Sequence, residues 1–108
     1  MSATCASFDK IRALIANDDW QASDHSLQRL YEKGIVVSEL ADGIAGSAVV
    51  EDYPSYHKGP CVLVLQTIST GPVHALWGLM SGTERPAVLI TAYHPDSKRW
   101  HTDNRTRR

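Results

Sequence analysis

The sequence predicts an α+β domain in which N-terminal helices pack on a four-stranded, mostly antiparallel sheet. Apolar residues recur at helical spacing in the first part of the chain. From residue 48 onward, apolar runs of strand length alternate with turns that contain Pro or Gly. The chain has 108 residues, of which 43% are hydrophobic, and this is enough for one packed core. We therefore expect a single domain over residues 1–108.

Two helices are expected before residue 35. The first covers residues 5–17, because its apolar residues fall on one face at helical spacing. The second begins at Ser23 or Asp24, either of which is a good N-terminal cap, and it ends at Gly34. The apolar face expected on this second helix consists of Leu27, Leu30 and Tyr31.

A third, shorter helix is expected over residues 38–45, with Ser38 as its cap and Gly46 as its end. The residues of this helix that are expected to face inward are Leu40, Ala41 and Ile44. Residues 1–20 precede the motifs discussed below, so they are expected to form an N-terminal helical extension.

Four strands are expected in the second half of the chain. They cover residues 48–53, 61–68, 73–80 and 87–94. The second is apolar on both faces, which favours a central position in the sheet. Because the strands follow the helices instead of alternating with them, an antiparallel meander packed on a helical layer is predicted.

Charge is distributed unevenly along the chain. Residues 1–97 carry six Lys and Arg against eleven Asp and Glu, a net charge of −5, whereas residues 98–108 carry five against one, a net charge of +4. A basic C-terminal tail on an acidic body suits a polyanion or an acidic protein partner. A frayed, solubilising terminus would have the same composition.

Several function classes have no support in the sequence. No apolar stretch reaches the length of a membrane span, and without a signal peptide the two cysteines fit a reducing, cytoplasmic setting. The histidines lack metal-ligand spacing and no nucleotide-binding motif is present, so no metal or cofactor is expected. Glu51 and Asp52 are expected to end a strand, because nothing else suggests the paired carboxylates of a glycosidase.

The second helix carries a possible catalytic pair, His25 and Arg29. These residues are four apart and therefore share a helix face, with Glu32 close to it. Cleavage of RNA through its own 2′-hydroxyl needs a base, an acid and a cation that stabilises the phosphorane. His25 and Arg29 would supply two of these groups. The alternative is a solvated face with an Arg29–Glu32 ion pair of little energetic value.

His74 and Tyr93 are the candidates within the predicted sheet. His74 lies in an apolar strand, where it is either a structural histidine with satisfied hydrogen bonds or an acid or base facing a cleft. Tyr93 ends the last strand, where it either contacts a base or phosphate or caps the core with a wet hydroxyl. The neighbouring segment His94–Asp96 is expected to form a turn.

The basic tail supplies candidates for binding RNA or a protein partner. Trp100 follows two cations, and an aromatic residue inside a basic run suits nucleic-acid contact. Trp100 could equally pin the tail to the sheet. The binding candidates in this segment are Lys98, Arg99, Trp100 and Arg105.

Several short motifs follow one another in a fixed order along the chain. They are His25-x3-Arg29-Leu30-x-Glu32-x-Gly34-Ile35, Glu51-x-Tyr53-Pro54, Pro72-x-His74, and Ile90-Thr91-x-Tyr93-x-Pro95-Asp96 followed by Trp100. Through these motifs the chain resembles the bacterial and archaeal family known as domain of unknown function 4258. The resemblance covers His25 to about Trp100, and Lys33 and His94 depart from the residues that the family often has there.

The resemblance implies a fold similar to RelE and ParE toxins, in the wider barnase-like group. It also implies a metal-independent endoribonuclease that acts as the toxin of a type II toxin–antitoxin system and is neutralised by a cognate antitoxin. The RNA substrate could be free or ribosome-bound mRNA, with His25, Arg29, His74 and Tyr93 as catalytic residues. The alternative is a non-catalytic protein-binding module of the same fold, which the acidic body favours.

Overall fold

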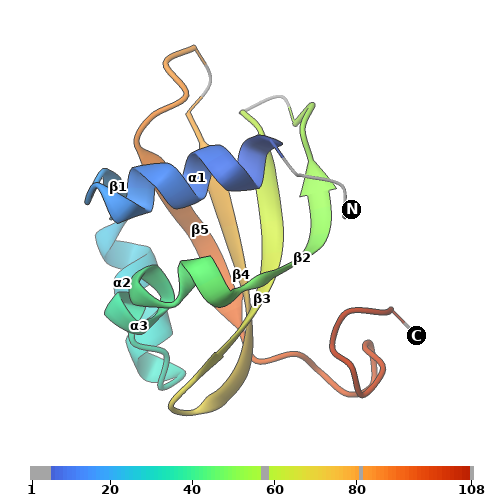
Figure 1. Cartoon of the computed structure of the whole chain (residues 1–108). Helices are drawn as coiled ribbons and strands as arrows, with labels where there is room; N and C mark the ends of the chain where they lie inside the picture. The colour runs from blue at the N-terminus through green and yellow to red at the C-terminus, as the bar shows by residue number, and fades with distance from the viewer. Residues whose placement is uncertain (1–5, 57–58, 81, 108) are drawn as a thin grey trace.

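The structure is a computed structural model that describes residues 6–56, 59–80 and 82–107, and it confirms the expected α+β class (Figure 1). Residues 1–5 of the predicted extension and Arg108 of the predicted tail lie outside these ranges. None of the described helices is long and apolar enough to cross a membrane. The helical elements are α1 (Ala6–Ala16), α2 (Asp24–Glu32), α3 (Val37–Asp42) and the 3₁₀ turn η1 (Ile44–Gly46). The strands are β1 (Trp20–Ala22), β2 (Ala48–Tyr53), β3 (Cys61–Ile68), β4 (Gly71–Leu79) and β5 (Ala87–Tyr93).

The sheet has five strands in the order β1-β5-β4-β3-β2, so the prediction of four strands was wrong. The four predicted strands do form an antiparallel meander, from β2 to β5. The additional strand β1 pairs in parallel with β5, with Trp20 opposite Ala87 and Ala22 opposite Leu89. Its three residues are too few for an alternating pattern to appear in the sequence. Its Trp20 ring instead meets the Trp77 ring edge to face, at 5.9 Å.

The ends of α2 follow from local chemistry, as predicted. Ser23 is the N-terminal cap, and its Oγ accepts a hydrogen bond from the backbone N–H of Ser26 at 3.1 Å. Gly34 follows the helix with φ of +74°, a conformation that glycine adopts without the steric cost of a Cβ.

The prediction of one helix over residues 38–45 was wrong in two respects. The helix α3 ends at Asp42, and a separate 3₁₀ turn follows. The N-terminal cap of α3 is Val36, which makes no side-chain capping bond, so Ser38 is not the cap. The inward-facing residues Leu40, Ala41 and Ile44 were predicted correctly.

Two polar contacts tie α3 to the β3–β4 hairpin. The carboxylate of Glu39 accepts hydrogen bonds from the backbone N–H and the hydroxyl of Ser69, at 2.8 and 2.7 Å. The buried Gln66 donates from Nε2 to the carbonyl oxygen of Leu40 at 2.9 Å. These bonds fix the hairpin against the helical layer.

The core lies between the helices and one face of the sheet. Side chains alternate along β3 and β4, and those on the helical side are fully buried. On α2 only Leu30 reaches this core, whereas Tyr31 is 83% exposed and Leu27 is also exposed, so the predicted apolar face of α2 was wrong for these two. The largest contributors to the core are Ile11, Leu30, Leu40, Val62, Val64, Val73, Trp77 and Leu89.

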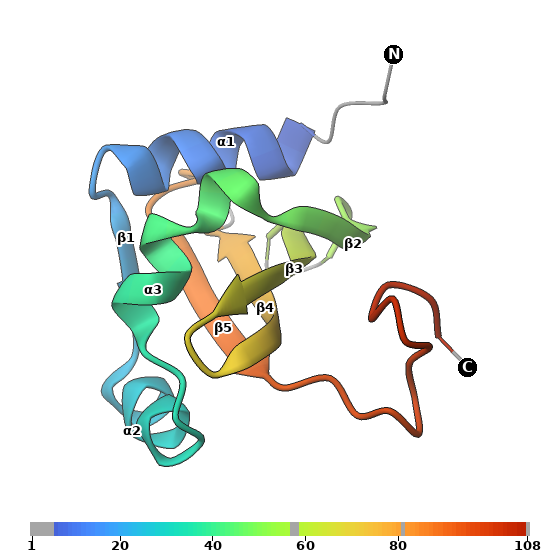
Figure 2. The same cartoon turned by 60° about the horizontal axis from the view of Figure 1, so that its bottom comes forward.

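The other face of the sheet, here called the open face, has no helix over it. The alternation places His74, Leu76 and Gly78 of β4 on the open face, since Val73, Ala75 and Trp77 belong to the core. The C-terminal segment, residues 94–107, leaves the end of β5 and lies on the side of the sheet opposite α1 (Figure 2). The sheet is therefore covered by helices on one face and partly by the chain's own end on the other.

Truncation of Leu40 to alanine should lower the free energy of unfolding by about 2–5 kcal/mol, because it opens a cavity between α3 and the sheet. Urea denaturation monitored by tryptophan fluorescence measures this change. Thr67→Ala, an exposed position on β3, is the control and should stay within about 0.5 kcal/mol of wild type. Equal stabilities for the two variants would contradict this description of the core.

Candidate functional site

The C-terminal segment is held to the open face by ring contacts around His74. Trp100 is 3% exposed and His74 is completely buried. The two rings meet edge to face with centroids 4.4 Å apart, and the ring of Tyr93 contacts His74 at 5.4 Å. Nε2 of His74 lies 2.6 Å from the backbone oxygen of Asn104. Of its two predicted arrangements, Trp100 adopts the one that pins the tail to the sheet.

The surroundings of His74 determine its protonation state. A carbonyl oxygen only accepts hydrogen bonds, so Nε2 carries the proton and donates it to Asn104. Nδ1 is buried with no hydrogen-bond partner among the described residues. Burial lowers the pKa of His74, although the Asn104 bond and the charge of Glu51 act in the opposite direction. His74 is therefore a neutral structural histidine while the C-terminal segment is docked.

An ion pair between Arg107 and Glu51 fastens the end of the segment to β2. The guanidinium donates from Nε and Nη2 to the two carboxylate oxygens of Glu51, at 2.8 and 2.9 Å. It also lies 4.5 Å from the centre of the Trp100 ring, and the hydroxyl of Tyr53 donates to the same carboxylate. The bond from Arg107 lowers the pKa of Glu51 to about 2. The side chains of Arg107 and Tyr53 therefore both donate hydrogen bonds to the Glu51 carboxylate.

Docking of the segment creates a surface hollow of about 410 Å³ at the end of β5, here called the C-terminal hollow. Both arginines that line it belong to the C-terminal segment, and Asp96 is the single acidic residue of the lining. Oδ1 of Asp96 accepts a hydrogen bond from the backbone N–H of Lys98 at 2.9 Å, and this bond shapes the turn. The lining residues are Tyr93, His94, Asp96, Arg99, Trp100 and Arg107.

Three groups in the C-terminal hollow are suited to an anion. Within the described residues the side chain of Arg99 makes no hydrogen bond and no ion pair. Nδ1 of His94 donates to the carbonyl oxygen of Pro72 at 3.2 Å, so Nε2 of the neutral ring keeps a free lone pair. Burial raises the pKa of Tyr93, so its hydroxyl keeps its proton and can donate a hydrogen bond. A guanidinium, an imidazole and a phenol thus surround one space.

The four predicted catalytic residues do not form one cluster. His74 and Tyr93 are in contact, but His74 lies beneath Trp100 and has no exposed surface. His25 and Arg29 are exposed on α2 and make no side-chain hydrogen bond or ion pair within the described residues. Both views place α2 at the β1 side of the sheet, away from the C-terminal segment (Figures 1 and 2).

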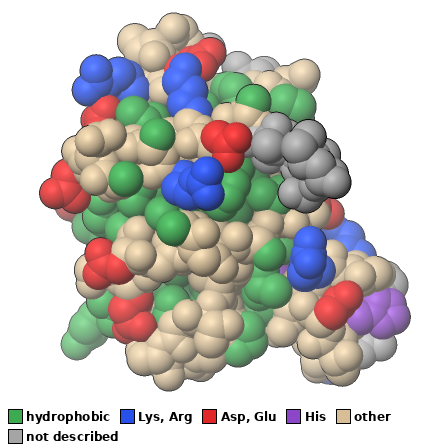
Figure 3. Space-filling view, viewed as in Figure 1, with side chains coloured by type: hydrophobic (Ala, Val, Ile, Leu, Met, Phe, Trp, Pro, Cys, Tyr) green, Lys and Arg blue, Asp and Glu red, His purple; other side chains and the backbone are tan. Residues whose placement is uncertain are grey.

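The predicted RNA- or partner-binding residues have different positions within the segment. Arg99 lines the C-terminal hollow and Trp100 is its buried anchor. Arg105 reaches β2, where its Nη2 donates to the backbone oxygen of Val49 at 3.5 Å, and Lys98 is exposed. On the helical face, Lys and Arg are interspersed with Asp and Glu and form no single basic patch (Figure 3).

Sequence reasoning did not include His94 among the catalytic candidates and missed the Glu51–Arg107 pair. His94 was placed in a turn and noted as a departure from the family motif that could change how a phosphate is held, and Glu51 was expected to end a strand. The opposite charges of the body and the tail were the available signal for the pair, but charge alone does not select partners 56 positions apart. In the described part of the chain no three His, Cys, Asp or Glu side chains are grouped to hold a metal ion.

The buried His74 should make the protein less stable in mild acid. Its pKa is lowered by folding, so the unfolded chain binds the proton more readily than the folded chain does. The stability contribution is complete above about pH 6.5 and is lost as the pH falls toward the folded pKa, at up to about 1.4 kcal/mol per pH unit. Urea unfolding at several pH values from about 5 to about 8 measures how the free energy of unfolding changes with pH.

In that comparison His74→Gln should reduce the pH dependence more than the control substitution His101→Gln, which changes an exposed histidine. An identical slope in wild type and His74→Gln would show that His74 is not held neutral by the fold.

Removing the charge of Glu51 should release the C-terminal segment. Glu51→Gln cannot form the charge-assisted pair with Arg107, so trypsin should cut after Lys98 and Arg99 several times faster than in wild type. The matched control is Asp52→Asn, which alters the adjacent exposed carboxylate. Equal cleavage rates for the two variants would mean that the ion pair does not hold the segment. Mass spectrometry of the fragments identifies the cuts.

Comparison with known proteins places most of the chain in one family. No curated protein and no solved structure matches the chain. Residues 22–94 match the family described as Domain of unknown function (DUF4258), and this range contains the elements from α2 to β5 and the motifs around His25, His74 and Tyr93. The match ends at His94, the first residue of the C-terminal segment that completes the hollow. The chain belongs to the DUF4258 family.

Proposed function

We propose that this protein is a metal-independent endoribonuclease that acts in the cytoplasm as the toxin of a type II toxin–antitoxin pair. The observation that carries the proposal is the C-terminal hollow, where Arg99, His94 and Tyr93 surround one space. Arg99 has no hydrogen bond or ion pair with another described side chain, and a cation of this kind beside groups that can move or donate a proton suits the phosphate of an RNA backbone. The toxin role and a RelE-like fold rest on the resemblance stated above.

The proposed chemistry is attack of the RNA 2′-hydroxyl on the adjacent phosphorus. Nε2 of His94 takes the 2′-hydroxyl proton, since its Nδ1 is occupied with Pro72. Arg99 stabilises the phosphorane charge, and Tyr93 donates its proton to the leaving 5′-oxygen as the bond between phosphorus and that oxygen breaks. The products are a 2′,3′-cyclic phosphate and a 5′-hydroxyl end.

These roles differ from those expected for His25, Arg29 and His74. His74 positions the Tyr93 and Trp100 rings from below, because it has no surface through which to reach a substrate. His25 and Arg29 lie on α2, away from the hollow (Figures 1 and 2). The proposal therefore assigns proton transfer to His94.

RNA cleavage with EDTA present, with and without ribosomes, tests the proposal. His94→Ala should reduce the cleavage rate by about 10²- to 10⁴-fold, as expected for loss of a general acid or base. The matched control His101→Ala removes an exposed histidine outside the hollow and should cleave like wild type. End-group analysis should find 2′,3′-cyclic phosphates.

Two results would contradict this assignment. RNA that remains intact in every reaction, with ribosomes included, would exclude the ribonuclease. Full loss of cleavage in His25→Ala together with normal cleavage in His94→Ala would move the active site to α2.

A protein-binding module is the second candidate, and the exposed apolar surface of α2 favours it. Tyr31 and Leu27 share a helix face and line a separate hollow of about 380 Å³ with Val36. Exposed apolar patches of this kind commonly mark protein contacts. A cognate antitoxin or another protein target would bind here, and intact RNA in the cleavage assay would make this the preferred function.

A further inference from the structure

A second concave surface lies on the open face, beside the C-terminal hollow. Two adjoining pockets of about 260 and 290 Å³ share Tyr56 and Ile90 in their linings. We call their combined surface the aromatic trough. The residues that define it are Tyr53, Tyr56, Leu76, Gly78, Met80 and Ile90.

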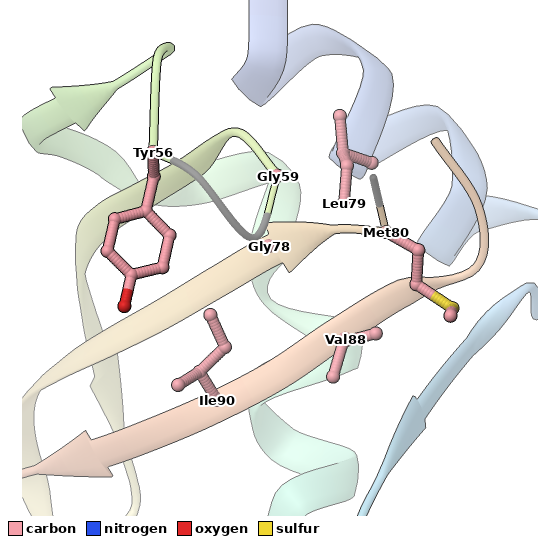
Figure 4. Close-up of a pocket in the computed structure, with 7 residues that line it drawn as sticks. All are labelled: Tyr56, Gly59, Gly78, Leu79, Met80, Val88 and Ile90. Carbon is pink, nitrogen blue, oxygen red and sulfur yellow. The ribbon is translucent and has the colours of Figure 1, made fainter. Parts of the chain in front are cut away.

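The aromatic trough contains exposed apolar side chains. Tyr56 is 46% exposed and Ile90 is 43% exposed, although both line the two pockets of the trough. The Tyr56 ring stands on one side, Met80 lies on the other, and Ile90 and Val88 of β5 lie between them (Figure 4).

The base of the trough depends on a glycine. A Cβ on Gly78 would lie 2.9 Å from Cδ1 of Ile90, so Ile90 folds down over the bare backbone of β4. A larger residue at this position would push Ile90 upward into the space. The β4 sequence thus keeps the trough open at its centre.

The aromatic trough and the C-terminal hollow are linked through Glu51. Tyr53 lines the trough, and its hydroxyl donates a hydrogen bond to the carboxylate of Glu51. Glu51 in turn holds Arg107, which lines the hollow. An apolar, aromatic pocket therefore lies one side chain away from a cationic one, on the same face of the sheet.

We propose that the aromatic trough binds a nucleobase of single-stranded RNA while a phosphate elsewhere on the same strand lies in the C-terminal hollow. This inference rests on the proposed function and adds the form of its substrate. A nucleotide joins a flat, apolar ring to an anion, which matches an aromatic surface beside arginines. An apolar protein segment would match the trough alone and would leave the cations without a counterpart.

The consequence is a preference for unpaired RNA. The bases of a duplex are stacked inside and cannot enter a pocket on a protein surface, whereas a single strand can turn a base outward onto an aromatic side chain. Because every base has a π-face, stacking on Tyr56 provides affinity with little sequence preference.

Binding of a fluorescein-labelled single-stranded RNA of about eight nucleotides, measured by anisotropy, tests the inference. Tyr56→Ala should weaken binding by about 5- to 150-fold, the range for loss of one base–aromatic stack. Tyr56→Phe keeps the ring and should bind like wild type. Tyr31→Ala is the matched control, because it removes an exposed tyrosine from α2, outside the trough.

A second probe, an oligonucleotide of the same length with abasic riboses, separates the two surfaces. Wild type should bind it more weakly than the intact RNA, and Tyr56→Ala should bind both equally. Arg99→Gln should weaken the binding of both probes and reduce the salt dependence.

Three outcomes would overturn the inference, and they differ in what they leave standing. Equal binding by Tyr56→Ala and Tyr31→Ala, with cleavage intact, removes the base site and leaves the ribonuclease. No binding of either probe by wild type removes both. A dimer in sedimentation velocity that Tyr56→Ala converts to monomer assigns the trough to a second copy of this chain.

Discussion

The burial of His74 beneath Trp100 is the contact on which the open face depends. It keeps a neutral imidazole inside the protein, bonded to the backbone of Asn104, and it orients the Tyr93 ring. The Glu51–Arg107 ion pair fastens the other end of the same segment. Without these contacts the basic segment would be a free tail and the C-terminal hollow would not exist. Residues 94–107 are therefore part of the folded domain.

The charge pattern of the chain has a physical explanation in this arrangement. The acidic body and the basic tail meet at Glu51, so part of the tail's charge is neutralised within the molecule. Arg99 lines the C-terminal hollow at the end of the sheet, and among the described residues its side chain makes no ion pair. A protein with a negative net charge can still bind RNA at such a concentrated positive site, because the local electrostatic potential acts on a nearby phosphate more strongly than the distant charges do.

Much of the fold could be predicted from the sequence, because helix caps and apolar periodicity are local. Ser23, Gly34 and the strand ranges on either side of the Ser69 turn were expected on that basis. Strand β1 was not predicted, because a segment of three residues is too short to show an alternating pattern. The exposure of Tyr31 was not predicted either, because helical spacing does not say which face of a helix packs on the core. The site depended on contacts between distant segments. The positions of His74 and Tyr93 could be named, but the Trp100 cover and the pairing of residues 51 and 107 could not, because no local pattern encodes which tail residue returns to which strand.

The central claim is that a single strand of RNA binds across the open face, with its phosphate in the C-terminal hollow and its base in the aromatic trough. Chemical-shift mapping by ¹⁵N-¹H NMR with a non-cleavable, 2′-deoxy-substituted oligonucleotide tests this most directly. The backbone signals of Tyr93, Arg99, Tyr56 and Gly78 should shift together with one affinity, while those of Arg29 and Tyr31 on α2 stay in place. Shifts confined to α2, or no shifts at all, would contradict the claim.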